Sequence, residues 1–161
     1  MRKEPDVTHE LKIERLIDAP PEIVFDTIVN PDVQDALFTG VVEGWGVRSF
    51  EIDLRVGGSW ITEFGPVDGA GEPDRITSVF TEVDRPRLLS YRTSMYVSEW
   101  GRTVDFTETI TFDEQDGKTL LTVVESGFET EADRDAFLGG VPDWVEAVAR
   151  VAAERAREGR G

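Results

Sequence analysis

FEIDLRVGGSWITEF, residues 50–64, has the alternating pattern of a β-hairpin. Apolar and polar residues alternate on both sides of a glycine pair, and we expect Gly57–Gly58 to form the turn. Trp60 and Phe64 share one face of the second arm and are predicted to point inward. The solvent face is expected to carry charges that can pair across the hairpin at small benefit: Asp53, Arg55 and Glu63.

A second hairpin is predicted in residues 102–128, RTVDFTETITFDEQDGKTLLTVVESGF. DEQDGK, residues 113–118, supplies its turn. One face of the first arm is apolar: Val104, Phe106, Ile110 and Phe112. Together with the alternating segments 75–84 and 87–97, these arms predict about six antiparallel strands in the middle of the chain.

A strand and two short helices are predicted before this β region. Residues 8–17 alternate as a first strand, and Asp18 is the expected N-cap of a helix that ends at Asn30–Pro31. Residues 31–38 predict a second short helix. The glycines of residues 39–48 predict a loop.

From Thr130 onward the pattern is helical. Pro142 follows two glycines, so we expect a break near Gly139–Gly140 and a main helix from there to Arg157. This helix is the only predicted element long enough to cover the apolar face of the sheet. Its stripe is expected to comprise Phe137, Leu138, Val141, Trp144, Val145, Val148, Val151 and Ala152.

Composition favours one globular domain over residues 1–161, with a core over about residues 8–157. The net charge of −16 argues against nucleic acid as a partner. No apolar run approaches the roughly 18 residues of a membrane span. The N-terminus lacks the apolar centre of a secretory signal, so we expect a cytoplasmic protein with no membrane partner. Exposed edge strands leave a monomer and a homodimer both open.

Glu108 interrupts an otherwise apolar strand face between Phe106 and Ile110. If Phe112 pairs with Leu121 on the next strand, Glu108 faces Glu125. Two carboxylates on the concave side need water, a cation or a raised pKa on one of them. The alternative is that this end of the sheet swings out and both side chains are solvated. Three partners for them are open: Tyr91, Arg92 and Arg102.

Several catalytic classes lack their residues in this chain. The chain has one histidine, His9, expected at the start of the first strand, and it has no cysteine, so neither a Ser-His-Asp arrangement nor a thiolate nucleophile can be built. The glycine-rich segments lack the helix that a phosphate-cradling loop requires. We therefore expect no metal and no cofactor.

The order of strand, two short helices, about six strands and a long helix resembles the SRPBCC superfamily, also called START-like or Bet v 1-like. Within it the chain is most similar to the activator of Hsp 90 ATPase homologue group. The strings that carry the resemblance are residues 17–32, 50–60, 81–91 and 104–128, with Trp144. The resemblance implies an α+β helix-grip fold, in which an antiparallel sheet of about seven strands wraps around the long C-terminal helix.

The resemblance also implies a cavity between the sheet and the C-terminal helix that binds an apolar small molecule. The residues expected to contact it are Phe38, Trp45, Trp60, Phe64, Tyr91, Met95, Phe106, Glu108, Glu125 and Trp144. The alternative for each aromatic residue is packing in the core.

Binding without catalysis is the favoured function, and three alternatives stay open. The first is a cyclase- or aromatase-like enzyme whose acid or base is Glu108 or Glu125. The second is a co-chaperone that activates the Hsp 90 ATPase. The third is resistance to a natural product by sequestration.

Overall fold

The computed structural model describes residues 9–38 and 41–160. Thr8 of the expected first strand and residues 39–40 of the expected loop lie outside these residues. The elements follow in the order β1 (His9–Ile17), α1 (Pro21–Val29), the 3-10 turn η1 (Pro31–Val33), α2 (Gln34–Phe38), β2 (Trp45–Ile52), β3 (Ser59–Pro66), β4 (Asp74–Asp84), β5 (Leu88–Val97), β6 (Arg102–Gln115), β7 (Lys118–Phe128), α3 (Glu131–Leu138) and α4 (Val141–Arg160).

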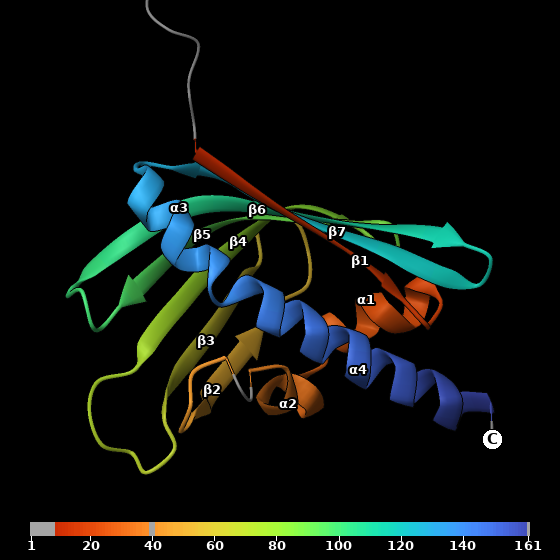
Figure 1. Ribbon diagram of the computed structural model, residues 1–161, viewed down its shortest axis with the longest axis horizontal. Helices are drawn as coiled ribbons and strands as arrows, with labels where there is room; N and C mark the ends of the chain where they lie inside the picture. The colour runs from red at the N-terminus through yellow and green to blue at the C-terminus, as the bar shows by residue number, and fades with distance from the viewer. Residues whose placement is uncertain (1–8, 39–40, 161) are drawn as a thin grey trace, which may run out of the picture.

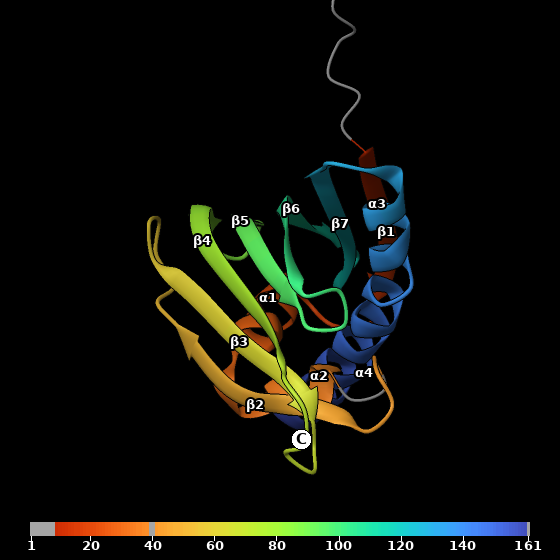
Figure 2. The same ribbon diagram turned by 90° about the vertical axis from the view of Figure 1, so that its left-hand side faces the viewer.

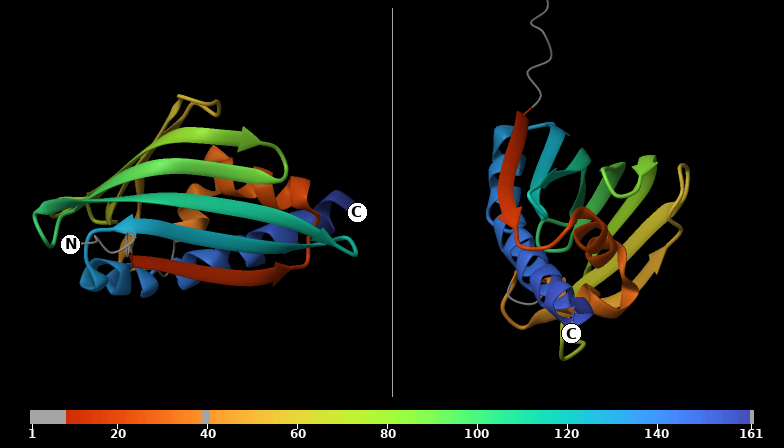
Figure 3. Two further views of the ribbon diagram at one scale, coloured as in Figure 1. Left: turned by 90° about the horizontal axis from the view of Figure 1, so that it is seen from above. Right: turned by 90° about the vertical axis from the view of Figure 1, so that its right-hand side faces the viewer.

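The strands form one seven-stranded antiparallel sheet in the order β1-β7-β6-β5-β4-β3-β2. From β2 to β7 each strand pairs with its neighbour in the chain, while β1 pairs with β7 at the far edge. The sheet is strongly curved, and its β2 end turns round toward the helices (Figure 2). All helices lie on the concave side (Figure 3). The fold is therefore the predicted α+β helix-grip.

Helix α4 lies along the concave face of the sheet, with α1 and α2 beside it (Figure 1). Its residues Val145, Val148 and Ala152 are almost fully buried, at the spacing of one helical stripe. The chain breaks between α3 and α4 at Gly139–Gly140, as predicted. Leu138 does not join the buried stripe, because its side chain at the end of α3 is exposed.

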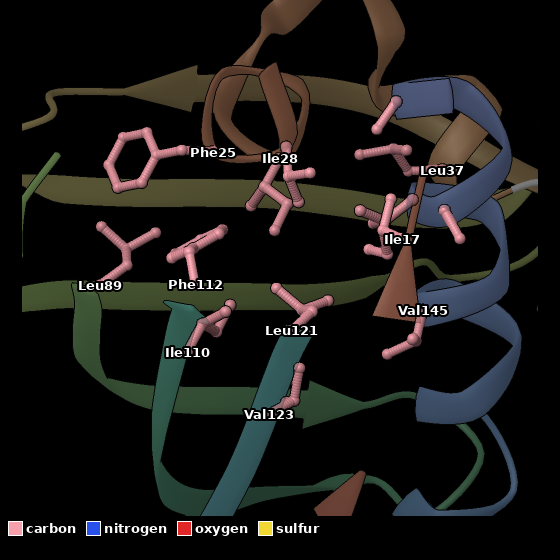
Figure 4. Close-up of a cluster of buried hydrophobic side chains, with 14 of the residues drawn as sticks. Ile17, Phe25, Ile28, Leu37, Leu89, Ile110, Phe112, Leu121, Val123 and Val145 are labelled. Atoms are coloured by element: carbon pink, nitrogen blue, oxygen red, sulfur yellow. The ribbon is translucent and has the colours of Figure 1, made fainter. Parts of the chain in front are cut away.

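The main core lies between the helices and the sheet, where α1 and α4 meet β6 and β7 (Figure 4). Phe25 of α1 packs on Phe112 of β6 with ring centroids 5.2 Å apart. Leu121 of β7 is also fully buried there. Each such side chain contributes about 1.5–3 kcal/mol by its removal from water, which fixes α1 and α4 against this half of the sheet.

The β6–β7 register is set by a two-residue turn. Asp116 and Gly117 have φ angles of 55° and 82°, the left-handed pair that closes a tight hairpin. Phe112 therefore pairs with Leu121, and Glu108 lies opposite Glu125, as the sequence predicts.

Two local predictions need correction, one at the start of α1 and one at the start of β2. Helix α1 begins at Pro21 with Pro20 as its N-cap, not Asp18, because a proline at the first helical position has no N–H that needs a capping side chain. Residues 45–48 belong to β2 rather than to a loop. Gly46 allows the Asp35 side chain to lie close to the backbone of β2, since a Cβ at this position would be 2.8 Å from Asp35 Oδ1. A register shift between Val47 and Ser49 interrupts the alternation and hides the strand.

The first hairpin has a longer connection than a glycine pair, because residues 53–58 join β2 to β3. Asp53 and Arg55 form an ion pair of 2.8 Å within this connection. Glu63 instead pairs with Arg75 of β4 at 3.1 Å. Within the described residues, no helix is both long enough and apolar enough to cross a membrane.

Candidate functional site

A pocket with a volume of about 480 Å³ lies between the sheet and the helices. Strands β2 to β7 supply its sheet side, while α2, the segment between α2 and β2, α3 and α4 supply the other. Its lining includes each of the candidate contact residues, namely Phe38, Trp45, Trp60, Phe64, Tyr91, Met95, Phe106, Glu108, Glu125 and Trp144.

Aromatic rings form much of the pocket wall. Phe64 of β3 lies 5.1 Å from the ring of Phe38 and 5.2 Å from that of Trp45, measured between centroids. On the other side, Phe106 of β6 lies 5.0 Å from Phe137 of α3. These contacts bring α2 and α3 against the sheet, of which β2 is the edge strand, so the wall is built from segments far apart in sequence.

All four tryptophans of the chain line the pocket. Trp60 is the most buried, and its ring packs edge-on against Tyr91 at 5.3 Å. Trp45 and Trp144 are half-buried, and Trp100 is exposed at the β5–β6 connection. The sequence prediction missed Trp100, because a loop carries no alternation from which an inward face can be read.

One cross-strand row forms what we call the polar floor: Tyr91 of β5, Glu108 of β6 and Glu125 of β7. The Tyr91 hydroxyl donates a hydrogen bond to Glu108 Oε1. Glu125 is only 4% exposed, which rules out the alternative that both carboxylates are solvated. Of the three candidate partners, Tyr91 is therefore the one that contacts the pair, whereas Arg92 is exposed.

Burial and neighbouring charge set the protonation of the polar floor. Burial, followed by the charge of Glu108 and a hydrogen bond with it, raises the pKa of Glu125 well above its usual value. Burial and the same carboxylate raise the pKa of Tyr91, so its hydroxyl remains a donor. Glu125 thus keeps a proton at pH values where an exposed glutamate has lost its own.

A second polar row lies beside the floor and was not singled out from sequence. Ser78 Oγ and Thr93 Oγ1 are buried and hydrogen-bonded at 2.8 Å. Asp74 is also buried, and it accepts hydrogen bonds from Ser98 N at 2.9 Å and Ser98 Oγ at 2.8 Å. The inward position of Ser78 could have been identified from sequence, because Ile76, Ser78 and Phe80 alternate on one face of a strand. Asp74 could not, because it falls in a segment whose residues are typical of turns.

Two buried polar atoms on the pocket residues have no hydrogen-bond partner among the described residues. They are the indole nitrogen Nε1 of Trp60 and the carboxyl oxygen Oε1 of Glu125. Buried polar atoms in folded proteins are nearly always paired, and an unpaired one costs about 1–3 kcal/mol. Leaving these two atoms unpaired in the pocket therefore lowers the free energy of unfolding of the protein.

The mouth of the pocket is marked by its solvent-exposed lining residues, which are Val42, Glu99, Trp100, Ala136 and Gly139. A bidentate ion pair joins its two sides. Arg102 of β6 donates to the buried carboxylate of Asp133 on α3 at 2.7 and 3.3 Å. The Arg102 guanidinium also lies 5.0 Å from the centre of the Trp100 ring. Arg102 therefore holds α3 beside the β5–β6 connection instead of reaching the polar floor.

The charged residues of the pocket lining are all acidic: Asp74, Glu99, Glu108 and Glu125. No lysine, arginine or histidine is among the described residues that line it. His9 lies at the start of β1, as predicted, away from this lining. In the described part of the chain, no cluster of three or more histidine, cysteine, aspartate or glutamate side chains is placed to hold a metal ion.

Solved structures share this architecture at low sequence identity. A protein from Rhizobium leguminosarum is 22% identical, with 92% of this chain and 95% of that chain covered and a TM-score of 0.75. A protein from Chromobacterium violaceum is 21% identical, with coverages of 90% and 97% and a TM-score of 0.76. An HSP90 activator from Plasmodium falciparum is 21% identical, with coverages of 74% and 73% and a TM-score of 0.52. These likenesses establish the fold.

No curated protein matches the sequence significantly. The family model described as activator of Hsp90 ATPase homolog 1-like protein matches residues 18–152, which include the first helix, the strands from β2 to β7 and most of α4. The chain therefore belongs to the activator of Hsp90 ATPase homolog 1-like family.

Proposed function

We propose that this protein binds an apolar small molecule in the pocket between its sheet and its C-terminal helices. Three properties of the pocket support the proposal. Its volume of about 480 Å³ lies within the roughly 300–1,000 Å³ common for small-molecule sites. Its wall is aromatic, and its few polar groups converge on one side. Such a site buries an apolar body and orients it by one polar end.

The observation that carries the proposal is the pair of unpartnered atoms, Trp60 Nε1 and Glu125 Oε1. One is a hydrogen-bond donor, and the other belongs to a carboxyl group. A core that only needed to be stable would gain by replacing both with apolar atoms of similar shape. A ligand with one polar group would recover part of this cost on binding, which gives the pocket a reason to keep them.

The direct test is a titration with N-phenyl-1-naphthylamine, a neutral, apolar probe with a single N–H whose fluorescence increases in apolar surroundings. We expect saturable binding with a Kd on the order of micromolar. Ala136→Trp places an indole at the mouth and should abolish the signal. Ala132→Trp is the matched control, because Ala132 is an exposed residue of the same helix that does not line the pocket.

Equal binding by both tryptophan variants would contradict the proposal, because the probe would then occupy another surface. Failure of the wild-type protein to bind the probe would contradict it as well. Circular dichroism of both variants distinguishes a blocked pocket from an unfolded chain.

A proton-transfer enzyme is the second candidate, and the hydrogen-bonded floor favours it. Glu125 lies opposite Glu108 inside an apolar pocket, and its carboxyl group, whose pKa is raised by burial, can act as a general acid. Such a group would suit the cyclisation or dehydration of a ring-forming substrate. Glu125→Gln separates the two functions, since it would abolish turnover by an enzyme but only alter the affinity of a binding protein.

Activation of the Hsp90 ATPase is a further hypothesis, raised by the family description and by the HSP90 activator from Plasmodium falciparum. The low identity to that protein carries the fold and no contact residue. Addition of the protein to a purified Hsp90 ATPase tests it. Stimulation that persists in Ala136→Trp would assign the activity to a surface outside the pocket.

A further inference from the structure

The charged side chains of the pocket lining are all of one sign. Its lining has carboxylates at the floor and at the mouth, while the described lining residues include no cationic side chain. The whole chain carries a formal charge of −16, so the field around the mouth attracts cations and repels anions. An organic acid would enter against this field and would find no basic partner on the pocket wall.

The polar floor offers a built contact for a cation. Glu108 and Glu125 are directly opposed in the β6–β7 ladder, where facing side chains lie about 5 Å apart at Cβ. Glu108 is held on one side by the Tyr91 hydroxyl. Glu125 is 96% shielded from solvent, lines the pocket, and keeps Oε1 without a hydrogen-bond partner in the described part of the chain. An acceptor therefore remains at the bottom of the pocket after the protein's own hydrogen bonds are made.

Aromatic side chains line the pocket together with this contact. Trp60 and Tyr91 meet edge-on above the sheet at 5.3 Å, and Phe106 flanks Glu108 on β6. Ring faces attract a positive charge, and the attraction grows when the charge is shielded from water. Carboxylates at the base of an aromatic cage are a combination that suits an ammonium group better than a hydroxyl group.

We propose that the ligand is a compact apolar molecule bearing a protonated amine, and that its ammonium group binds between Glu108 and Glu125. This inference rests on the proposed small-molecule function and names its ligand class. The apolar body lies against the aromatic wall toward Phe64 and Trp144, and the ammonium donates to Glu125 Oε1.

Binding of the amine exchanges one cation for another. The charged and titratable groups that face Glu125 are Glu108 from β6 and Tyr91 from β5, while β1 presents Leu11 to it. In the empty pocket the proton on Glu125 limits the repulsion between the two carboxyl groups. The ammonium takes over that role, the proton leaves to solvent, and the net charge of the floor is unchanged.

Three probes that share one apolar body test the ligand class: 1-adamantanemethylamine, 1-adamantanemethanol and 1-adamantanecarboxylate. The quenching of tryptophan fluorescence reports binding, because the four tryptophans line the pocket. We expect the amine to bind about tenfold or more tightly than the alcohol, and the carboxylate to bind most weakly. Calorimetry in buffers of different ionisation enthalpy should detect proton release with the amine and none with the alcohol.

The variant Glu125→Gln tests whether Glu125 is the source of the preference for the amine. It should remove the advantage of the amine over the alcohol, and circular dichroism shows that the variant folds. Glu99→Gln is the matched control, because it makes the same substitution at the exposed mouth, away from the polar floor, and should keep the advantage.

The outcomes separate the inference from the function on which it rests. Equal affinities for amine and alcohol, or an advantage that survives Glu125→Gln, overturn the amine assignment while the bound naphthylamine upholds the pocket as a binding site. Failure of the naphthylamine and of all three adamantanes to bind overturns both.

Discussion

Glu125 of β7 lies directly opposite Glu108 of β6, so two carboxyl groups meet at the floor of an aromatic pocket. The Tyr91 hydroxyl binds one of them, and burial keeps a proton on the other. A buried acid beside a second carboxyl group is costly to fold. The predictions below follow from that cost and from the contacts that offset it.

Glu125→Gln should stabilise the protein at alkaline pH. The pKa of Glu125 is raised above its usual 4.5, so the folded state holds a proton that the unfolded state releases. Its contribution to the free energy of unfolding is therefore full below about pH 4.5 and is lost as pH rises through the folded-state pKa. Glutamine stays neutral and removes this loss. Urea unfolding should show the variant to be more stable at pH 8, with the difference narrowing toward pH 4.

Glu82→Gln serves as the control for that experiment, because Glu82 is exposed on β4. It should leave the pH dependence of unfolding unchanged. A wild-type protein whose stability does not fall between pH 5 and pH 8 would contradict the assigned protonation of Glu125.

Tyr91→Phe should destabilise the protein by about 1.5–3 kcal/mol, because it removes the hydroxyl donor from a carboxylate inside the protein. Tyr96→Phe removes a matching hydroxyl from Glu72 on the exposed side, where water can replace the hydrogen bond, and should have a much smaller effect. Chemical denaturation of both variants measures the difference. Equal losses would argue that the Tyr91–Glu108 bond adds nothing beyond a surface contact.

Arg102→Gln should lower the melting temperature by leaving the buried carboxylate of Asp133 without its guanidinium partner. Arg102 lowers the pKa of Asp133 below its usual 3.8, so the contribution is present above that pH and is lost as pH falls through the folded-state value. Differential scanning calorimetry should show a gap from wild type at pH 7 that closes in acid.

Arg85→Gln breaks an ion pair of the same 2.7 Å length, but its partner Asp26 is exposed. It should therefore leave the melting temperature nearly unchanged. A larger loss in Arg85→Gln than in Arg102→Gln would contradict a structural role for the pair at the pocket mouth.

The carboxyl pair could be predicted from sequence because local rules fix it. Asp116–Gly117 closes a tight hairpin, the hairpin fixes its register, and the register places Glu108 against Glu125. The inward faces of β3, β5 and β6 follow from the same two-residue alternation. The carboxyl pair and these inward faces were therefore accessible, since each depends on neighbours in one sheet, whereas Tyr91 stayed one of three candidate partners.

Other parts of the pocket could not be predicted in the same way. Trp100 lies in a connection without periodicity, and Asp74 follows a glycine-rich segment that reads as turns. The start of β2 at Trp45 could not be predicted, because a glycine in this segment is typical of a turn. Gly46 instead allows the close approach of Asp35. Contacts between α3 and the β5–β6 connection are tertiary, so no local pattern in the sequence reports them.

The most direct measurement of the central claim is an NMR titration of the ¹⁵N-labelled protein with N-phenyl-1-naphthylamine, observed at the tryptophan indole N–H signals. The account predicts saturable shifts of the Trp60, Trp45 and Trp144 signals, the largest at Trp60, whose Nε1 is buried without a partner among the described residues. Amide signals of exposed residues on the outer face, such as Glu82, should stay in place. Unchanged indole signals, alone or with shifts on the outer face, would contradict the claim that the pocket is the binding site.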